Sequence, residues 1–326
     1  MEYADSKTTA TKSDDVIQQP VVDPAEPGMN PLCEAESSPE MFSSLGEPVE
    51  VPLPFPFEFT EGPVWLEHEQ ALLISAWNFR DPTNGQGPPT SILKYAQGTW
   101  SVWSEKGVHG SNGLAIDSNQ NIVAALHDRQ EISRITPDGT RQVVGSSYQG
   151  KAFNSPNDLT VAKDGTIYFT DPAYQRDGRE GQGLITGVYA ISPNGAINPV
   201  DLSLTRPNGI VLSPDEKLLY VGGSDGKIFR YRMEINGEIK ADGVLATPGK
   251  GIDGMSVDCA GNIYATVPSE KSVHVYSPAG ILLTTIAGFK YNPTNVAFGG
   301  TNKNTMFVTT AGHLFQVEMK IPGFPY

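Results

Sequence analysis

The sequence is poor in several features that would indicate other classes of protein. It has only two cysteines, Cys33 and Cys259, in 326 residues, so no disulfide-rich scaffold is indicated. We expect two free thiols, and a disulfide between them stays open. No run of about 18 apolar residues occurs, so we predict no membrane span. No segment keeps a helical periodicity, and the 34 glycines and 26 prolines are typical of an all-β chain with many turns.

Positive charge is also scarce. Lys and Arg together number 23 against 37 Asp and Glu, which gives a net charge of −14. This balance disfavours nucleic acid and anionic membranes as partners, because both are polyanions. The histidines are scattered and do not suit a zinc site. The sequence has no Gly-x-Ser-x-Gly elbow and no glycine-rich phosphate loop, so it indicates neither a serine hydrolase nor a nucleotide site.

The N-terminal region differs in composition from the rest. Residues 1–48 contain ten acidic and two basic residues and few aromatics. Such a segment buries too little apolar surface to offset its chain entropy. We therefore predict a largely disordered acidic tail at 1–46 and one folded domain at 47–326. The first residues lack the regions of a signal peptide, which leaves open a cytoplasmic protein or a periplasmic or secreted one with its leader removed.

What the chain has instead is one short pattern that occurs six times. Each copy opens with a carboxylate or amide residue followed by a run of strand-forming residues, 42 to 51 residues after the previous copy by subtraction. The opening residues are Glu61, Asn112, Asn157, Asn208, Asp253 and Asn295. A period of roughly 40–50 residues in a strand-rich chain indicates a propeller. We predict a six-bladed β-propeller with four-stranded blades.

The two ends of this array predict how the ring closes. The last repeat offers only three strand-like runs, so we expect residues 47–53 to supply the fourth strand of the last blade. Long polar insertions follow Trp77 and Tyr174, where we expect either functional or disordered loops.

The repeats also predict where the site lies. The innermost strands of a propeller line its channel, so the six opening side chains would meet at one mouth. Two acids at close range are costly unless a cation offsets their charge. Carboxylate and amide oxygens suit Ca²⁺, which accepts about 6–8 oxygen ligands. The alternative is that Asn and Asp before Gly are ordinary turn residues.

Several motifs, in the same order, resemble the gluconolactonase branch of the regucalcin (senescence marker protein)/gluconolactonase family. They are Phe59-Thr-Glu-Gly-Pro-Val-Trp, Phe153-Asn-Ser-Pro-Asn-Asp-Leu, Phe169-Thr-Asp-Pro, Arg206-Pro-Asn-Gly, Ser213-Pro-Asp-Glu-Lys and Gly251-Ile-Asp-Gly-Met. The resemblance implies a six-bladed propeller with one catalytic divalent metal, usually Ca²⁺, with Zn²⁺, Mn²⁺ and Mg²⁺ as alternatives. It implies the metal ligands Glu61, Asn157, Asn208 and Asp253, and places Asn112 near substrate. Ser155 stands where regucalcin has an arginine.

The chemistry that follows is metal-assisted ester hydrolysis. Asp253 is the candidate general base, and the alternative is that it is a ligand only. His127 is a candidate donor or hydroxyl contact, or a structural histidine. Asp171, Trp77 and Tyr174 are candidate substrate contacts, or residues that cap a turn or pack.

We therefore expect a calcium-dependent hydrolase of carbohydrate metabolism that opens a sugar lactone such as D-glucono-1,5-lactone. The alternatives are a related hydrolase of other lactones or phosphotriesters, and a non-catalytic binding propeller with a structural calcium ion. The expected partner is a small-molecule lactone, and the expected state is a monomer or weak homodimer.

Overall fold

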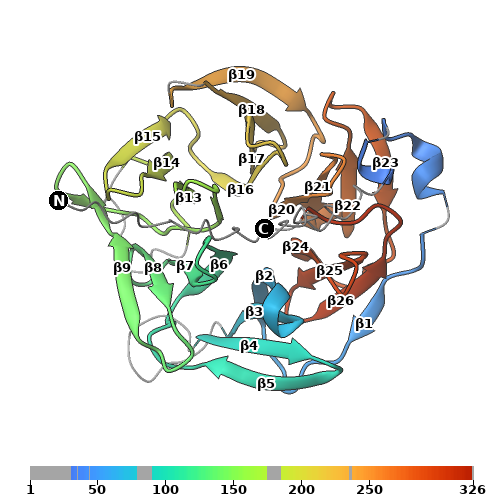
Figure 1. The fold of residues 1–326 in the computed structure, drawn as a ribbon, viewed down its shortest axis with the longest axis horizontal. Coiled ribbons are helices and arrows are strands. Elements are labelled where there is room, and N and C mark those ends of the chain that lie inside the picture. Colours follow the sequence, from blue (N-terminus) through green and yellow to red (C-terminus); the bar gives the residue numbers. More distant parts are fainter. Residues whose placement is uncertain are drawn as a thin grey trace, which may run out of the picture. The chain divides into compact units, whose positions relative to one another are not determined.

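The computed structural model describes residues 31–34, 36–43, 45–78, 90–174, 185–234 and 237–324. Within these ranges, helix is confined to α1 (Pro31–Glu34) and the short 3₁₀ turns η1 (Pro39–Phe42), η2 (Glu67–Glu69) and η3 (Pro268–Glu270). Six antiparallel four-stranded sheets are arranged around a central axis (Figure 1). The predicted six-bladed propeller is confirmed.

Blades 1 to 5 each consist of four consecutive strands, ordered from the axis outward. Their bounds are β2 (Phe59–Leu66), β3 (Ala71–Trp77), β4 (Thr90–Ala96) and β5 (Thr99–Ser104); β6 (Ser111–Ile116), β7 (Ile122–Leu126), β8 (Glu131–Ile135) and β9 (Arg141–Gly145); β12 (Leu159–Val161), β13 (Ile167–Asp171), β14 (Gly187–Ile191) and β15 (Ile197–Asp201); β16 (Pro207–Leu212), β17 (Leu218–Gly223), β18 (Ile228–Met233) and β19 (Ile239–Ala246); β20 (Met255–Val257), β21 (Ile263–Val267), β22 (Ser272–Tyr276) and β23 (Leu282–Ile286). A small hairpin, β10 (Ser147–Tyr148) and β11 (Lys151–Ala152), lies between blades 2 and 3 in the chain.

Blade 6 combines both ends of the propeller sequence. Its strands are β24 (Pro293–Gly299), β25 (Thr305–Thr310), β26 (Leu314–Glu318) and, outermost, β1 (Val49–Val51). β1 pairs antiparallel with β26, and the two lie side by side at the ring's seam (Figure 1). The prediction that residues 47–53 close the last blade is confirmed.

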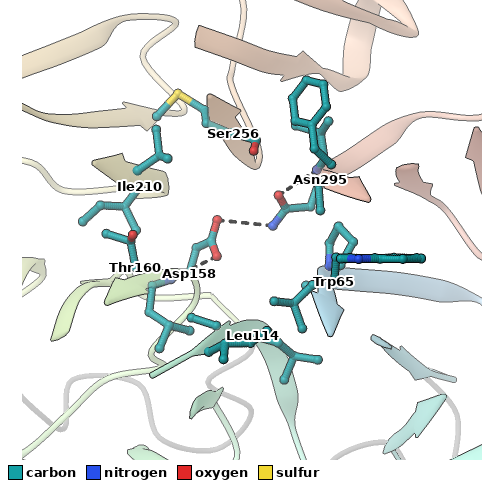
Figure 2. Close-up of a pocket in the computed structure, with 18 of the residues that line it drawn as sticks. Trp65, Leu114, Asp158, Thr160, Ile210, Ser256 and Asn295 are labelled. Carbon is teal, nitrogen blue, oxygen red and sulfur yellow. Dashed lines mark hydrogen bonds between the residues drawn. The ribbon is translucent and has the colours of Figure 1, made fainter. Parts of the chain in front are cut away.

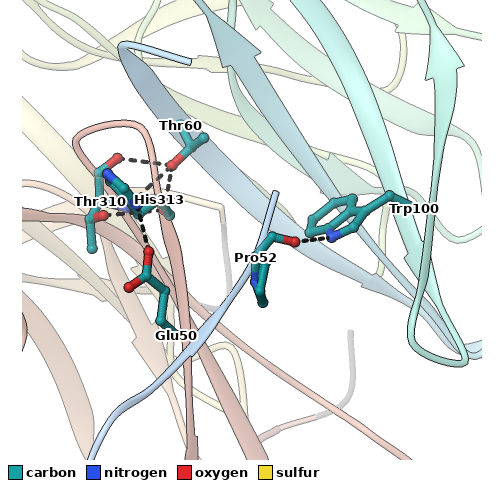
Figure 3. A network of polar contacts seen from close by, with 6 residues as sticks. All are labelled: Glu50, Pro52, Thr60, Trp100, Thr310 and His313. Carbon is teal, nitrogen blue, oxygen red and sulfur yellow. Dashed lines mark hydrogen bonds and ion pairs between the residues drawn. The ribbon is translucent and has the colours of Figure 1, made fainter. Parts of the chain in front are cut away.

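Polar contacts reinforce this seam (Figure 3). His313 Nδ1 lies 2.7 Å from Glu50 Oε1, next to the β1–β26 pairing. Thr60 Oγ1 of blade 1 donates to the carbonyl oxygens of Thr310 and His313 in blade 6, each at 2.8 Å. Trp100 Nε1 donates to Pro52 O at 2.8 Å. The N-terminal strand is therefore fixed to the last blade by main-chain pairing and to the first by a side chain.

The apolar core lies between neighbouring blades. The second strands β3, β7, β13 and β21 are buried along their whole length, because a blade is covered on both faces by the blades beside it. This explains why their sequences are continuous apolar runs and do not alternate. The stacked blades hold the inner strands in place around the channel.

The segment before β1 departs from the expectation for a disordered tail over part of its length. Cys33 forms a disulfide with Cys259, so the expectation of two free thiols is wrong. Phe42 is buried against blades 5 and 6, with Leu32 and Met41 packed beside it. Leu32, Met41 and Phe42 are too few to make the composition of residues 1–48 look like that of a folded segment. The predicted boundary at residue 46 stays a prediction, and most of the predicted tail, residues 1–30, lies outside the described residues.

No helix in the described ranges is long and apolar enough to cross a membrane.

Candidate active site

The opening residues of the repeats meet at one end of the channel. A cavity of about 540 Å³ is lined by five of the six: Glu61, Asn112, Asn157, Asn208 and Asp253. The sixth, Asn295, lies next to them and faces the interior of the channel (Figure 2). We call this end of the inner strands the cavity end, and the other the opposite end.

Irregular pairing aims these side chains inward. The register between first and second strand shifts at Glu61 in blade 1, at Asn112 in blade 2, at Asn208 in blade 4 and just before Asn295 in blade 6. A bulge of this kind inserts an extra residue and re-aims a side chain, and bulges are common beside active sites. Asn112 and Asn208, which precede Gly, lie inside strands, so the alternative interpretation as turn residues is wrong for these two. Asn295 also lies inside a strand.

The glycines that follow bring neighbouring blades together at the axis. Gly113 N donates to Asn157 O, and Gly209 N donates to Asp253 O, each at 2.8 Å and each from one blade to the next. Gly62 has a φ of 53°, and a Cβ there would lie 2.1 Å from Asn112 O. A side chain at this position would force the inner strands apart. Where a Gly follows an opening residue, as in blades 1, 2, 4 and 5, the close approach of backbones requires it.

Electrostatic repulsion and burial dominate the chemistry of the cavity. The pKa of Glu61 is raised well above its usual value, first by burial and then by the charges of Asp253 and Asp158. Burial raises the pKa of Asp253 to about 7, although a hydrogen bond from Asn208 acts in the opposite direction. Burial likewise raises the pKa of Asp158 to about 7. These carboxyl groups therefore favour either a proton or a nearby cation.

One amide group links two of these acids. Asn295 Nδ2 donates to Glu61 Oε2 at 3.0 Å. It also donates to Asp158 Oδ2 at 3.2 Å (Figure 2). Val296 N donates to Asn295 Oδ1 at 2.8 Å, which fixes the amide orientation. Asp158 also lines a smaller cavity of about 80 Å³, deeper in the channel. Sequence reasoning missed Asp158 because it assigned one polar residue to each repeat, although the Asn157-Asp158 pair was a visible signal.

One atom in the cavity wall lacks a partner. Asn112 Oδ1 is buried and accepts no hydrogen bond from the described residues. A buried carbonyl oxygen without a donor is costly, and functional sites are where such groups occur. The position of Asn112 on the cavity lining makes this oxygen available to a ligand.

The other predicted substrate contacts fall into two groups. Tyr174 lines the cavity. Trp77, His127 and Asp171 are buried and are not among the residues that line it. The rings of Trp77 and His127 meet edge to face with centroids 5.8 Å apart. The insertions 79–89 and 175–184, which we expected to be functional or disordered, lie outside the described residues.

Asp171 holds the loop that precedes Asn157. Its carboxylate accepts hydrogen bonds from the backbone N–H groups of Asn154 and Ser155 at 2.8–2.9 Å. The side chain of Ser155, where an arginine stands in regucalcin, donates to the carbonyl oxygens of Pro172 and Tyr174. The loop is thereby fixed to the end of β13.

Residues that sequence reasoning did not single out as contacts complete the rim. They include Phe59, Arg206, Ser224, Ile252, Pro268 and Ser269. Arg206 stands two residues before Asn208, in a motif that was noted without a role for the arginine. Its guanidinium carbon lies 5.1 Å from the centre of the Tyr174 ring, in a cation–π contact.

Comparison with known proteins fits this geometry. Residues 59–312 match the family model described as SMP-30/Gluconolactonase/LRE-like region. A gluconolactonase of Zymomonas mobilis is 30% identical, with 86% of this chain and 83% of that protein covered. A pentonolactonase of Haloferax volcanii is 27% identical over 61% of this chain and 67% of that protein.

Solved structures of proteins from this family have the same fold. A gluconolactonase of Xanthomonas campestris superimposes with a TM-score of 0.72 at 27% identity, over 88% of this chain and 94% of that one. Regucalcin of Agrobacterium tumefaciens, described as a calcium-binding protein, shares the fold with a TM-score of 0.67 at 17% identity, over 86% and 98% of the two chains. The resemblance noted in the sequence motifs is confirmed, and the chain belongs to the SMP-30/gluconolactonase family of β-propeller enzymes.

Proposed function

We propose that this chain is a divalent-metal-dependent lactone hydrolase that opens a sugar lactone, such as D-glucono-1,5-lactone, to the aldonic acid. The observation that supports it most is the set of buried acids and amides facing one cavity, Glu61, Asp253, Asn157 and Asn208, in a chain whose relatives are named lactonases. A cation bound at this shared position would offset the cost of burying the charges of Glu61 and Asp253.

The residues present fit a hard divalent cation. Glu61 Oε2 accepts both of the hydrogen bonds found for that carboxylate in the described ranges, which leaves Oε1 available. Glu61, Asn157, Asn208 and Asp253 would hold the ion, and their all-oxygen donor set suits Ca²⁺. No group of three or more His, Cys, Asp or Glu side chains in the described ranges is arranged to hold a metal, which agrees with a set that contains only two acids. A bound divalent cation supplies Lewis acidity toward the carbonyl and a lower pKa for water.

In the proposed reaction Asp253 moves the proton. It faces the cavity, and its hydrogen bond with Asn208 orients the carboxylate. In our proposal the ionised carboxylate accepts a proton from water as the water oxygen bonds to the lactone carbonyl carbon. The ring C–O bond then breaks, and the departing ring oxygen takes up a proton to become a hydroxyl group of the aldonic acid. General-base assistance of this kind is typically worth roughly 10²–10⁴ in rate.

The remaining polar groups bind and orient substrate. Asn112 Oδ1, which accepts no hydrogen bond from the described residues, would accept one from a sugar hydroxyl. Tyr174 bounds the cavity at the rim. Contact of substrate with Trp77, His127 and Asp171 stays a prediction.

Acid release from D-glucono-1,5-lactone, measured with Ca²⁺ and with excess chelator, tests the proposal. Turnover that chelation abolishes and Ca²⁺ restores would support it. Turnover of a phosphotriester without turnover of any lactone would replace it by the related hydrolase. Calcium binding without turnover of either would favour the non-catalytic alternative.

A further inference from the structure

A second cavity adjoins the candidate active site. It measures about 290 Å³ and lies over blade 4, where its lining includes Ser203, Thr205, Asp225 and Phe229. Arg206 and Ser224 line both this cavity and the central one. We call it the lateral cavity. Pockets for small ligands typically measure ~300–1,000 Å³, so the central cavity alone holds a monosaccharide lactone and the lateral cavity adds room for one more unit.

The boundary between the two cavities is held in place. Tyr174 Oη lies 2.7 Å from Ser224 Oγ and donates to Arg206 O at 3.4 Å. The guanidinium of Arg206 rests against the Tyr174 ring and makes no ion pair or hydrogen bond with another of the described residues. Its five N–H groups are therefore available at the point where a ligand would pass from one cavity to the other.

The lining of the lateral cavity suits a neutral polyol. Thr205 offers a hydroxyl group that can both donate and accept a hydrogen bond. Ser203 Oγ already donates to Asp201 Oδ1 at 2.6 Å, so it can only accept, and Ser224 Oγ already shares a hydrogen bond with Tyr174 Oη. Arg206 supplies donors and Asp225 supplies acceptors, so cation and anion offset each other. The ring of Phe229 adds an apolar surface. A purely apolar ligand would leave these polar groups without partners, at a cost.

An anionic ligand fits less well. The carboxylate of Asp225 lies on the same lining, and its ion pair with Lys227 is long, at 3.7 Å, with both side chains about half exposed. A phosphate or carboxylate held by Arg206 in the lateral cavity would meet this negative charge. A sugar ring carries no charge and uses both kinds of group.

We propose that the lateral cavity is a glycosyl subsite, and that the enzyme's substrate class extends to 1,5-lactones of disaccharides. The lactone ring would occupy the central cavity near Asp253, and the second sugar would lie over blade 4 against Arg206 and Asp225. This inference rests on the proposed lactonase function.

The test compares kcat/KM for D-glucono-1,5-lactone with kcat/KM for cellobiono- and maltobiono-1,5-lactone, which differ in linkage geometry. Loss of one good hydrogen bond is worth about tenfold. We expect the wild type to prefer at least one disaccharide lactone by about tenfold or more. Asp225→Ala should reduce that preference about tenfold, mainly through KM, and leave the monosaccharide lactone unchanged within about twofold.

The chain offers a matched control. Asp215 pairs with Lys217 at 3.0 Å and has the same Asp-x-Lys spacing, but it precedes β17, whereas Asp225 follows it. Asp215→Ala should leave kcat/KM unchanged for both the monosaccharide and the disaccharide lactones. Thr205→Trp, which fills the lateral cavity without touching the central one, should lower kcat/KM for the disaccharide lactone alone, with the melting temperature as a check of folding.

Several outcomes would overturn the subsite. One is equal kcat/KM for all three lactones in the wild type, and another is an equal loss on every lactone in Asp225→Ala. A preference for 6-phospho-glucono-1,5-lactone over both neutral classes, lost in Arg206→Gln, would assign Arg206 to an anion instead. If the wild type hydrolyses D-glucono-1,5-lactone but shows no gain with a disaccharide, the subsite alone fails. If it hydrolyses no lactone, the proposed function fails.

Discussion

The buried carboxylates at the two ends of the inner strands differ in how many hydrogen bonds they accept. At the cavity end, both hydrogen bonds to Glu61 within the described ranges reach one oxygen, and one of their donors is shared with Asp158. At the opposite end, Asp258 accepts hydrogen bonds from the backbone of Ala260, from the backbone and side chain of Asn262, and from Tyr264 Oη. Burial alone therefore does not identify a functional acid. The number of donors around each carboxylate separates a candidate site from scaffold.

The scaffold role of the opposite end is visible in another blade. Asp117 in blade 2 accepts hydrogen bonds from the backbone of Asn119 and from the backbone and side chain of Asn121. It gains a cation as well, because Arg134 Nε lies 2.8 Å away. The same Asp-x-x-x-Asn turn thus joins the first and second strands of blades 2 and 5, and in each case it satisfies its own carboxylate.

The opposite end also anchors both ends of the propeller domain. The Cys33–Cys259 disulfide joins the N-terminal segment to blade 5, and Asn262 Nδ2 donates to Ser37 Oγ at 2.7 Å. At the C-terminal side, Cys259 N donates to Pro322 O at 2.9 Å. Changes at this end should therefore alter stability and spare turnover, whereas changes at the cavity end should lower turnover.

The largest effect should come from Asp253→Asn at the cavity end. Asn keeps an oxygen for the cation but cannot accept a proton, so kcat should fall by about 10² or more at saturating Ca²⁺, with KM little changed. Glu61→Gln should instead weaken metal affinity, and added Ca²⁺ should partly restore activity. Lactonase kinetics across a calcium titration measure both. Near-native kcat for Asp253→Asn at saturating Ca²⁺ would make Asp253 a ligand only.

Metal removal should produce the second-largest effect, because it leaves the negative charges of the cavity-end acids without a cation beside them. A ligand that binds only the folded form stabilises it by ~3–4 kcal/mol at several hundred times its Kd. Excess chelator should therefore lower the melting temperature, and Ca²⁺ should restore it. An unchanged melting temperature after verified metal loss would argue against the proposed site.

The disulfide tests the opposite end. It closes a chain separation of 226 residues, and disulfides typically stabilise by ~2–4 kcal/mol. Cys33→Ser should lower the unfolding free energy by about that amount, and reduced wild type should match it. Turnover should stay at the wild-type value in both, since Cys259 lies at the end of β20 away from Asp253. A loss of kcat in the folded variant would break the division between the two ends.

The repeat period made the fold predictable, because each blade repeats the same polar opening followed by an apolar second strand. The closing strand was predictable from the missing fourth run of the last blade. The sequence also indicated which residues share the cavity, since equivalent positions in a propeller converge on its axis. Glu61, Asn157, Asn208 and Asp253 do line one cavity.

What sequence could not reveal depends on contacts between distant segments. The Cys33–Cys259 pairing joins segments with no common pattern. Asp158 had a signal in the Asn157-Asp158 pair, but its hydrogen bond with Asn295 joins blades 3 and 6, a contact that no repeat pattern predicts. The ring contact between Trp77 and His127, and the position of Arg206 on the linings of two cavities, follow from side-chain packing at strand ends. Such packing has no periodic signal.

The smallest predicted effect compares two acids of the opposite end by their pH dependence. Burial raises the pKa of Asp258 to about 6, above its ordinary 3.8, and its donors offset this only in part. The pKa of Asp117 is below its ordinary value, because its hydrogen bonds, first among them that from Arg134, outweigh the effect of burial. A raised carboxyl pKa contributes stability that is complete below the unfolded pKa and is lost as pH rises through the folded pKa. A lowered pKa contributes stability above the unfolded pKa that is lost as pH falls.

The experiment is chemical denaturation of wild type, Asp258→Asn and Asp117→Asn from pH 4 to pH 7 in chelator. Subtracting each variant from wild type cancels the acids of the cavity end, which are the same in all three proteins. For Asp258 the difference in unfolding free energy should shrink as pH rises, by on the order of 2 kcal/mol, since one pKa unit corresponds to about 1.4 kcal/mol. For Asp117 it should stay level above pH 4 and shrink only on further acidification. If both differences followed the same pH course, neither the depth of burial nor the charge of Arg134 would set the pKa of these two carboxyl groups, and the physical explanation of their contrast would fail.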